Sequence, residues 1–375
     1  MKGESNMERT GELLARAAEK PFALARDERA TLLSLRDAAD INALFSAAYS
    51  VKTAICGREV ALRALIECGN VCAKDCLYCG IRKSNGAVAR YRLGADEIVR
   101  LAEGAAAQGY ASLVIQSGEI ESEDQTRLVE EVLRRIAPLD LGVTLSLGEQ
   151  SEEVYRRWRD AGAVRYLLRI ETSNESLYRA LHPANHSWAR RVECLRALRR
   201  CGYQVGTGVM CGLPGQTAGD LADDIGFFAD MDVDMIGMGP FIPHPETPLA
   251  GEPLDAESRL LLGLKMIAVT RLHLHDVNIA AATALQALAP DGRERGVLAG
   301  ANVVMPNVTD VEHRRLYQLY ANKPCLNESA GLCRGCLERR FAAIGEKLAI
   351  GRRGDSLHFR RRMGIASEPY EPIVR

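Results

Sequence analysis

Short apolar runs rich in β-branched residues alternate along the chain with longer patterns of helical period. After a helical stretch over about residues 8–55, the runs predict eight strands, at 61–67, 111–117, 141–148, 165–171, 203–210, 234–240, 278–283 and 302–306. Helical patterns fill the intervals, as in "TAGDLADDIGFFADM", where Thr217 is placed to cap the helix N-terminus. Eight strand–helix alternations without a long linker predict an α/β fold, a complete (β/α)8 TIM barrel.

The barrel pattern leaves a segment at each end of the chain. We expect an N-terminal helical segment at 1–57, the barrel at 58–306, and an irregular C-terminal extension at 307–375. The basic tail "GRRGDSLHFRRR" (351–362) is expected to be solvated and partly disordered, because charged residues dominate it. Neither a P-loop nor a G-x-G-x-x-G motif follows a predicted strand, which argues against a nucleotide-binding open sheet.

Composition narrows the class of protein only slightly. The 375 residues are 47% hydrophobic and 26% charged, with a formal net charge of -1. These values are typical of a globular protein and give no general reason to expect nucleic acid or a membrane as a partner. The first twenty residues lack the apolar region of a signal peptide, and no run reaches the length of a membrane span, so we expect a cytoplasmic protein.

Two tight clusters stand out among the eleven cysteines, a pattern that in a reducing compartment indicates metal rather than disulfides. Cys72, Cys76 and Cys79 form a C-x3-C-x2-C run in the loop after the first predicted strand, where TIM barrels place their active sites. Structural zinc takes four protein ligands, and Cys68, the remaining thiol nearby, ends a strand of the barrel wall. Three thiolates instead leave one iron of a 4Fe-4S cluster open to an exogenous ligand.

This spacing, with the aromatic Tyr78 before the last cysteine, resembles the signature of the radical S-adenosylmethionine (SAM) superfamily. The segments "QSGE", "VTLSLGE", "RYLLRIET", "GLPGQT" and "ANVVMPN" resemble the HydE family of FeFe-hydrogenase maturases, nearly end to end from about residue 58 to 336. The resemblance implies reductive cleavage of SAM to a 5'-deoxyadenosyl radical. It also implies a small cysteine-derived iron carbonyl-cyanide or sulfur substrate, in assembly of the H-cluster and its dithiomethylamine bridge.

The resemblance assigns roles to residues near the strand ends. SAM would be bound by Tyr78, Gln116, Ser117, Glu119, Glu171 and Arg191. The substrate would lie deeper, against Arg63, Thr144, Ser146, Arg169, Met235 and Thr283, covered by Tyr317 and Tyr320. Buried arginines need anions, which favours a carboxylate- or cyanide-bearing substrate.

Alternatives stay open at several of these positions. A shift by one place from Arg191 to Arg190 is compatible with the resemblance, and Arg63 could pair with Glu67 on its own strand. Core packing is the simpler explanation for Met235 and for the two tyrosines. Ala282 stands where the family tends to carry the first of two threonines, which weakens the assignment of the neighbouring Thr283.

The second cluster of cysteines lies beyond the last predicted strand. Cys325, Cys333 and Cys336 form a C-x7-C-x2-C run, for which the resemblance implies an accessory 2Fe-2S or 4Fe-4S site. Zinc, with His313 as fourth ligand, is the alternative. We expect the scattered Cys56, Cys194 and Cys201 to be inert buried thiols.

Partners and competing functions follow from the same resemblance. It implies other hydrogenase maturases and an electron donor as partners of a monomer. Another radical SAM reaction is the first alternative, either a methylornithine synthase-like rearrangement or a biotin synthase-like sulfur insertion. The insertion needs a second cluster held by inner cysteines, whereas strands two and three offer only Ser117 and Ser146. The second alternative is a non-enzymatic iron-sulfur scaffold or electron-transfer protein, in which each cluster would have four protein ligands.

Overall fold

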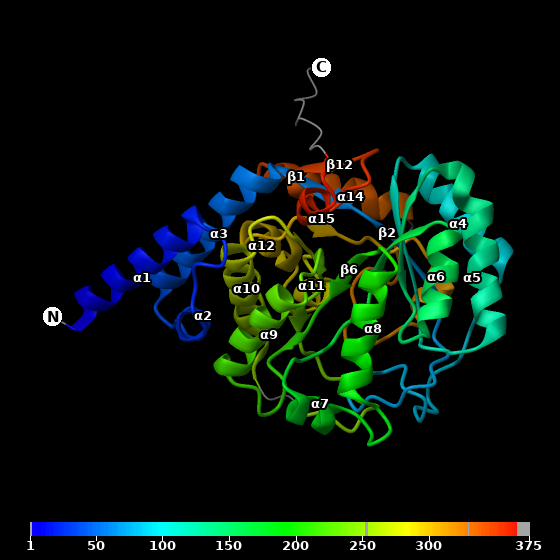
Figure 1. The fold of residues 1–375 in the computed structure, drawn as a ribbon, viewed down its shortest axis with the longest axis horizontal. Coiled ribbons are helices and arrows are strands. Elements are labelled where there is room, and N and C mark those ends of the chain that lie inside the picture. Colours follow the sequence, from blue (N-terminus) through cyan, green and yellow to red (C-terminus); the bar gives the residue numbers. More distant parts are fainter. Residues whose placement is uncertain (1, 252–253, 329, 366–375) are drawn as a thin grey trace, which may run out of the picture.

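A curled, parallel, seven-stranded sheet forms the centre of the molecule, which is a computed structural model that describes residues 2–251, 254–328 and 330–365 (Figure 1). The strand order is β10-β8-β6-β5-β4-β3-β2, so strands consecutive in the chain lie side by side. Its strands are β2 (Ala64–Gly69), β3 (Ser112–Ser117), β4 (Gly142–Ser146), β5 (Ala163–Leu167), β6 (Gln204–Thr207), β8 (Met235–Ile236) and β10 (Asn278–Ile279). A two-stranded ladder, β7 (Met210–Cys211) with β9 (Gly239–Pro240), extends two of the connections.

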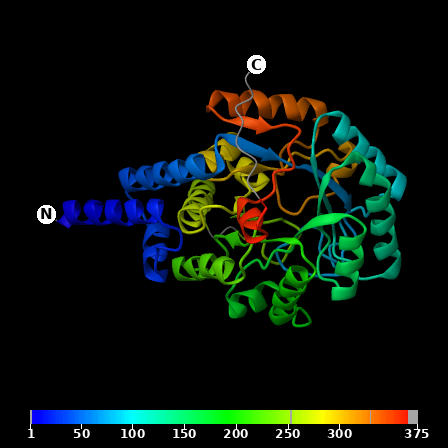
Figure 2. The ribbon, with the colours of Figure 1, turned by 45° about the horizontal axis from the view of Figure 1, so that its top comes forward.

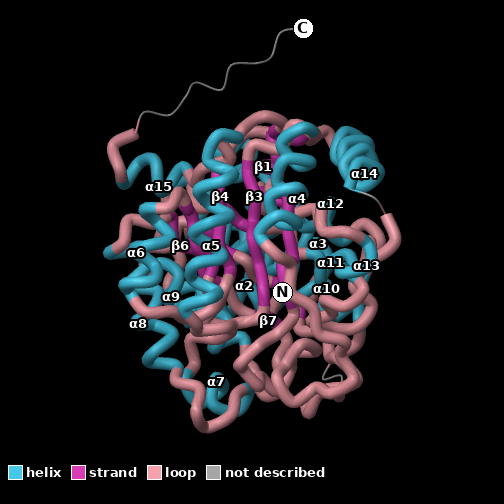
Figure 3. Tube along the Cα trace, turned by 90° about the vertical axis from the view of Figure 1, so that its right-hand side faces the viewer, coloured by secondary structure: helices cyan, strands magenta, loops and turns pink. Residues whose placement is uncertain are grey.

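Helices connect these strands, and most of them cover the outer face of the sheet, while α7 lies below the strand ends (Figure 3). They are α4 (Ala95–Ala107), α5 (Glu123–Ile136) with the short 3-10 helix η1 (Ala137–Leu139), α6 (Glu152–Asp160), α7 (Glu175–Leu181), α8 (Trp188–Arg200), α9 (Ala218–Asp230), α10 (Ala256–His273), α11 (Thr283–Leu288) and α12 (Gly292–Leu298). The cap predicted at Thr217 is confirmed, because its hydroxyl accepts from the Asp220 backbone and the Asp220 carboxylate accepts from the Thr217 backbone.

The last predicted strand lies outside the seven-stranded sheet. β11 (Val303–Val304) pairs with β1 (Glu59–Leu62), and β1 also pairs with β12 (Lys347–Ala349). The strand predicted at 61–67 is divided at Arg63 into β1 and β2. Isolated parallel bridges connect Val303 to Ala280 and Asn307 to Leu65, at the two edges of the larger sheet. The α/β class and the curled parallel sheet are therefore confirmed, whereas the strand pairing stops short of a complete eight-stranded barrel.

The N-terminal helices pack on one side of the sheet. Among α1 (Lys2–Glu19), α2 (Arg26–Leu33) and α3 (Ala38–Cys56), α1 packs on α3, α2 packs on α9, and all three contact α10; α1 projects away from the rest of the molecule (Figure 1). A fully buried ion pair between Lys52 and Glu346 connects α3 to the start of β12. No helix in the described part of the chain has the length and apolar character needed to cross a membrane.

The described part of the C-terminal extension contains regular helices and a strand, and the expectation of an irregular segment was wrong there. It contains α13 (Val311–Arg314), α14 (Ala330–Ala343), β12 and α15 (Leu357–Arg362). Segment 351–362, expected to be solvated, covers the N-terminal ends of the barrel strands, where α15 lies over the middle of the sheet (Figure 2). Asp355 pairs with the fully buried Arg165 of β5 and accepts a hydrogen bond of 2.6 Å from Gln204 Nε2. Charge density misled the prediction because the partners of these charges lie far away in the sequence.

One prediction concerns pH and His358 of α15. Its Nε2 lies 2.6 Å from Asp232 Oδ1 and its Nδ1 lies 3.2 Å from Asp276 Oδ1, and the hydrogen bond to Asp276, followed by the one to Asp232, raises the His358 pKa although burial opposes it. A raised folded-state pKa means that this stabilisation is complete below the unfolded pKa of about 6.5 and is lost as pH rises through the folded value.

We therefore expect the urea midpoint of the natural chain to fall between pH 6 and pH 9 by more than that of His358→Gln. Arg361 and Arg362, which also approach these carboxylates, stay charged throughout and contribute equally at both pH values. Equal falls in the two proteins would show that His358 does not carry the pH dependence.

Candidate active site

The loop after β2, residues 70–94, lies at the C-terminal ends of the strands, on the side opposite α15 (Figure 1). It holds Cys72, Cys76 and Cys79, all partly buried. The three thiols are close enough for the charge of one to affect the pKa of the next. The backbone N–H of Glu119, after β3, donates to Cys72 Sγ at 3.3 Å, a contact that favours a thiolate.

These thiols fit an iron-sulfur cluster with three protein ligands. Burial raises the pKa of Cys76 to about 12 and raises that of Cys79 further, so both are protonated at neutral pH unless a cation takes the place of the protons. Cys68 belongs to the main hydrophobic cluster of the molecule, beside Ser117 and Arg92. The fourth thiol of the motif region is therefore part of the core and is not grouped with the other three.

Gly118 brings the end of β3 against this loop. A Cβ added to it would lie 2.3 Å from the Val71 carbonyl oxygen and 2.8 Å from Cys72 Cβ. Such distances are shorter than real Cβ contacts, and the nearest atom is backbone, which cannot move aside easily. The glycine of the "QSGE" segment thus permits the close approach that places Glu119 beside Cys72.

Four charged side chains form a network beside the thiols. Lys74 Nζ lies 3.0 Å from Glu119 Oε1 and 2.9 Å from Glu149 Oε2, and Arg191 Nε lies 2.8 Å from Glu149 Oε1. Burial raises the pKa of Glu119; at Glu149 burial acts in the same direction, but Arg191 and Lys74 outweigh it and lower the pKa. The Arg191 side chain is 10% exposed and that of Arg190 is 49% exposed, so Arg191 is the inward arginine of the pair.

The other residues expected to bind SAM lie around this network. The Tyr78 hydroxyl is 3.3 Å from His182 Nε2, and Ser117 Oγ donates to the Gly118 carbonyl at 2.7 Å. Gln116 Nε2 donates to the Tyr317 hydroxyl at 3.1 Å, which turns it toward the expected substrate side. Glu171, with a left-handed φ of 67°, pairs with Arg169 at 3.0 Å.

Three residues expected to contact substrate line one cavity inside the sheet. Arg63, Thr144 and Met235 contribute to its wall, together with Asn278, and its cavity volume is ≈ 20 Å³. Arg63 donates to Met235 Sδ at 3.0 Å and to the Gly354 carbonyl at 3.2 Å. Within the described chain, Arg63 Nε and Thr144 Oγ1 are buried without a hydrogen-bond partner.

Arg63 does not form the ion pair with Glu67 that was the simpler alternative. Glu67 instead pairs with Lys323 at 2.5 Å and accepts from Asn307 Nδ2 at 2.7 Å. Burial, followed by the neighbouring Arg165, lowers the pKa of Arg63, and Asp355 opposes both. The cavity wall therefore holds a guanidinium that no carboxylate of the described residues pairs with directly, an environment that an anion would stabilise.

The remaining expected substrate contacts do not line this cavity. Ser146 lies opposite Gln116 in the sheet, and Thr283 begins α11 with its Oγ1 3.5 Å from Arg293 Nη2. Tyr317 is buried with Lys323 Nζ 5.2 Å from its ring centre, and burial also raises the pKa of Tyr320. Arg169 donates to a backbone carbonyl at 3.0 Å as well as to Glu171.

The second cysteine run is placed only in part. Cys336 lies on α14, and Cys325 lies in a loop with a left-handed φ of 61° and its Sγ 3.9 Å from Gln286 Nε2. The side chain of Cys333 lies outside the described residues. The His313 ring lies tilted against the Tyr91 ring, with centres 4.8 Å apart, and does not form a group with Cys325 and Cys336 within 4.8 Å among the described side chains.

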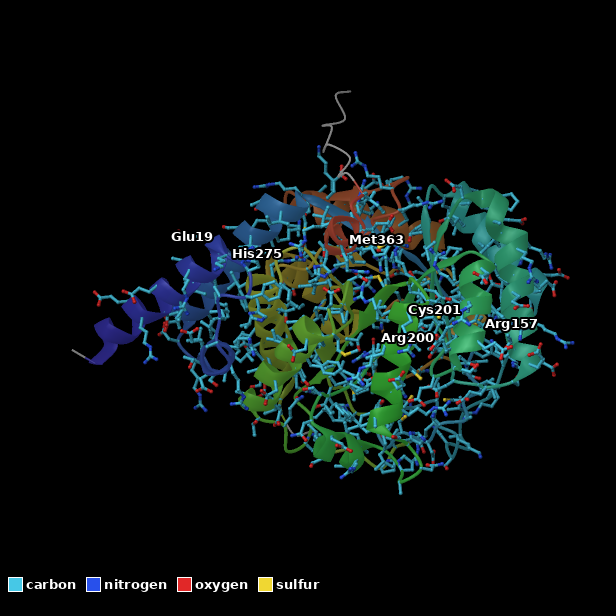
Figure 4. The ribbon with its side chains drawn as sticks, viewed as in Figure 1. Glu19, Arg157, Arg200, Cys201, His275 and Met363 are labelled. Carbon is cyan, nitrogen blue, oxygen red and sulfur yellow. The ribbon has the colours of Figure 1, made fainter. Side chains whose placement is uncertain are left out.

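Of the thiols expected to be inert, two are buried. Cys56 and Cys194 match the expectation, but Cys201 is only partly buried, beside Arg200 after α8 (Figure 4). Sequence reasoning placed Glu149 among the polar residues at the strand ends without giving it a role, and it missed several other residues of the site, which are Lys74, His182, His186, Lys323 and Asn278. Lys74 could have been found from its place between two cysteines.

Comparison with known proteins agrees with this geometry. Residues 66–228 match the model of the Radical SAM superfamily. The [FeFe] hydrogenase maturase subunit HydE of Thermotoga maritima is 43% identical over 336 residues, which make up 90% of this chain and 94% of that protein. The chain belongs to the HydE family of radical SAM enzymes. Membership implies a 4Fe-4S cluster and SAM as its cofactors.

Other proteins are similar to this chain in sequence or in fold. 3-Methylornithine synthase of Methanosarcina barkeri is 30% identical over 76% of this chain and 79% of its own length. The crystal structure of methylornithine synthase has a TM-score of 0.78 at 26% identity and covers 94% of this chain and 100% of that one. The maturase HydG of Carboxydothermus hydrogenoformans, at 18% identity, shares the fold with a TM-score of 0.79 over 93% of this chain and 80% of its own.

Proposed function

We propose that this HydE-family enzyme uses SAM and a 4Fe-4S cluster held by Cys72, Cys76 and Cys79 in assembly of the FeFe-hydrogenase H-cluster. Its substrate would be a small cysteine-derived iron carbonyl-cyanide or sulfur compound on the way to the dithiomethylamine bridge. The observation that carries the proposal is the similarity to HydE over nearly the full length of both chains. Other hydrogenase maturases and an electron donor would be its partners.

The charged network is suited to a zwitterion such as the methionine part of SAM. When bound, the cluster supplies the electron for reductive cleavage of SAM. Glu119 and Glu149 can accept from an ammonium group, and Arg191 can donate to a carboxylate. Because Lys74 already bridges the two glutamates, a bound ammonium would replace one cation with another and keep the buried carboxylates paired.

The inner cavity is suited to an anionic substrate. Arg63 presents a buried positive charge there, and Thr144 presents a hydroxyl without a partner in the described chain. We propose that the bridges at 302–308 close the sheet into a (β/α)8 barrel over 58–306, with 1–57 and 307–375 as flanking segments. Enclosure of this kind orients the reactants and keeps water and stray hydrogen donors away from a radical.

For the accessory site, we propose an iron-sulfur cluster bound by Cys325, Cys333 and Cys336. The thiol ligands and the match to HydE over the same region support it. Removal of Cys325 by Cys325→Ser should lower the bound iron while SAM cleavage by the first cluster continues.

A prediction separates the two neighbouring arginines. Arg191→Ala should weaken SAM binding at least about tenfold, the equivalent of ~1.4 kcal/mol, because it removes a buried charge-assisted contact. Arg190→Ala should change the Kd less than about threefold, since that side chain is half exposed. Equilibrium dialysis of SAM against reconstituted protein measures both, and equal losses would contradict the placement of Arg191.

The function itself is tested by turnover. Reduced, reconstituted protein with SAM should form 5'-deoxyadenosine faster when the cysteine-ligated iron carbonyl-cyanide compound is added. Parallel incubations with ornithine-type precursors and with dethiobiotin should show no such stimulation. Formation of methylornithine would instead establish the second candidate, which the full-length match to methylornithine synthase supports. An iron-sulfur EPR spectrum that SAM leaves unchanged would favour a non-enzymatic scaffold.

A further inference from the structure

Two buried histidines lie beside the cysteine loop and have no part in the roles above. His182 ends α7 and His186 lies in the loop before α8; they are 4% and 8% exposed. A ring nitrogen of each and Sγ of Cys76 all lie within 4.8 Å of one another. The ring centres of the two histidines are 5.5 Å apart with an angle of 37° between the planes.

The hydrogen bonds of His182 determine its tautomer. Its Nδ1 lies 2.8 Å from the carbonyl oxygen of Tyr178, and a carbonyl can only accept, so Nδ1 carries the proton. Its Nε2 is then the acceptor for the Tyr78 hydroxyl at 3.3 Å. Stacking on the Tyr178 ring at 4.0 Å holds the imidazole in this position. Both nitrogens of His182 are therefore already in use. The Tyr78 hydroxyl is shared between His182 and Cys76, whose pKa it lowers against the effect of burial.

His186 differs because one nitrogen is unused. Its Nδ1 is buried and has no hydrogen-bond partner within the described chain. The backbone N–H of His186 donates to the Pro183 carbonyl at 2.9 Å, which fixes the turn that presents the ring. A buried polar atom without a partner is costly, so a ligand that supplies an acceptor at this place would be stabilised.

We propose that His186 is a positioning residue of the cluster: its Nδ1–H, which has no partner among the described residues, donates a hydrogen bond to the Cys76 thiolate when the cluster is bound and makes the cluster easier to reduce. The inference rests on the proposed ligation by Cys76, and it is independent of the identity of the substrate. An N–H donor near a ligand sulfur stabilises the extra negative charge of the reduced cluster, and hydrogen bonds to sulfur are among the factors that set cluster potentials.

A separate metal ion bound by Cys76, His182 and His186 is the competing explanation of this group. It would require His182 to give up its bond to the Tyr178 carbonyl or to the Tyr78 hydroxyl. It would also require Cys76 to leave the three-cysteine set to which its spacing assigns it. The hydrogen-bond assignment needs neither change.

The test compares three full-length, reconstituted proteins: the natural chain, His186→Leu and His186→Asn. Leucine removes the donor, whereas the asparagine amide keeps an N–H near the position of Nδ1. At a fixed solution potential, the ratio of reduced to oxidised cluster should fall about tenfold in His186→Leu, which corresponds to ~59 mV for a one-electron couple. His186→Asn should restore most of this ratio.

A second measurement identifies the residue that donates to the cluster. With histidine labelled by 15N, pulsed EPR of the reduced cluster should show a weak histidine coupling that disappears in His186→Leu. Unchanged potentials, or a coupling that persists in this variant, would overturn the inference, as would a strong coupling typical of direct iron–nitrogen ligation. Bound iron and sulfide are measured in parallel, because a natural chain that assembles no 4Fe-4S cluster refutes the proposed function rather than this role of His186.

Discussion

Replacement of Cys76 by alanine is expected to abolish reductive cleavage of SAM and to lower the iron bound after anaerobic reconstitution by about four atoms per chain, the content of one 4Fe-4S cluster. The physical reason is the number of ligands. Three thiolates hold the cluster in our proposal, and the described chain offers no further thiol grouped with them. Iron analysis and the formation of 5'-deoxyadenosine measure the two effects.

Cys68→Ala is the matched control for this prediction. Cys68 lies in the same region of sequence but packs in the hydrophobic core, and burial raises its pKa to about 12. Its replacement should leave the iron content and the SAM-dependent change in the EPR spectrum intact. Loss of the cluster in Cys68→Ala would mean that all four irons are anchored by the protein, and it would remove the open position that SAM requires.

The second large effect concerns Asp355, in the segment that covers the N-terminal ends of the strands. Asp355→Ala is expected to lower the free energy of unfolding by about 3 kcal/mol, because it leaves the fully buried guanidinium of Arg165 without its carboxylate. We place the effect at the low end of values for buried pairs because the Asp355 side chain is 31% exposed. Urea unfolding followed by circular dichroism measures it.

Two variants control for this prediction. Asp140→Ala removes the partner of Arg353 in the same segment, but the Asp140 side chain is 88% exposed, so a loss below about 1 kcal/mol is expected. The double variant Arg165→Met with Asp355→Ala should recover most of the stability, since it removes the buried charge together with its partner. Comparable losses in Asp355→Ala and Asp140→Ala would show that the buried charge is not what holds the segment in place.

Strand positions were predictable because they depend on local pattern. The run at 111–117 became β3 at Ser112–Ser117, and the run at 141–148 became β4 at Gly142–Ser146. The run at 61–67 was predicted as one strand, but the buried Arg63 divides it into two. Apolar periodicity locates strands, and it does not show which backbone partner each strand finds.

Part of the candidate site could also be predicted from local sequence, and part of it could not. The spacing of Cys72, Cys76 and Cys79 is a local property, and one loop carries all three thiols, close enough for the charge of one to affect the pKa of the next. The inward orientation of Arg191 rather than Arg190 was undetermined, because both lie in one turn of α8 and both pair with Glu149. The contact of Arg191 with Glu119 and its lower exposure distinguish the two, and both depend on the tertiary structure. His186 gave no signal in the sequence, since its importance comes from the fold bringing its loop to Cys76.

The sequence by itself determined the α/β class, the thiol loop after the first strand and the resemblance to the HydE family, because each depends on residues that are close together in the sequence. Only the tertiary structure decided the position of segment 351–362. The local sequence of charges predicted a solvated tail, but Asp355 forms an ion pair with Arg165, which lies 190 positions away in the chain. A buried charge must find a partner wherever the fold offers one, and sequence separation carries no information about that choice.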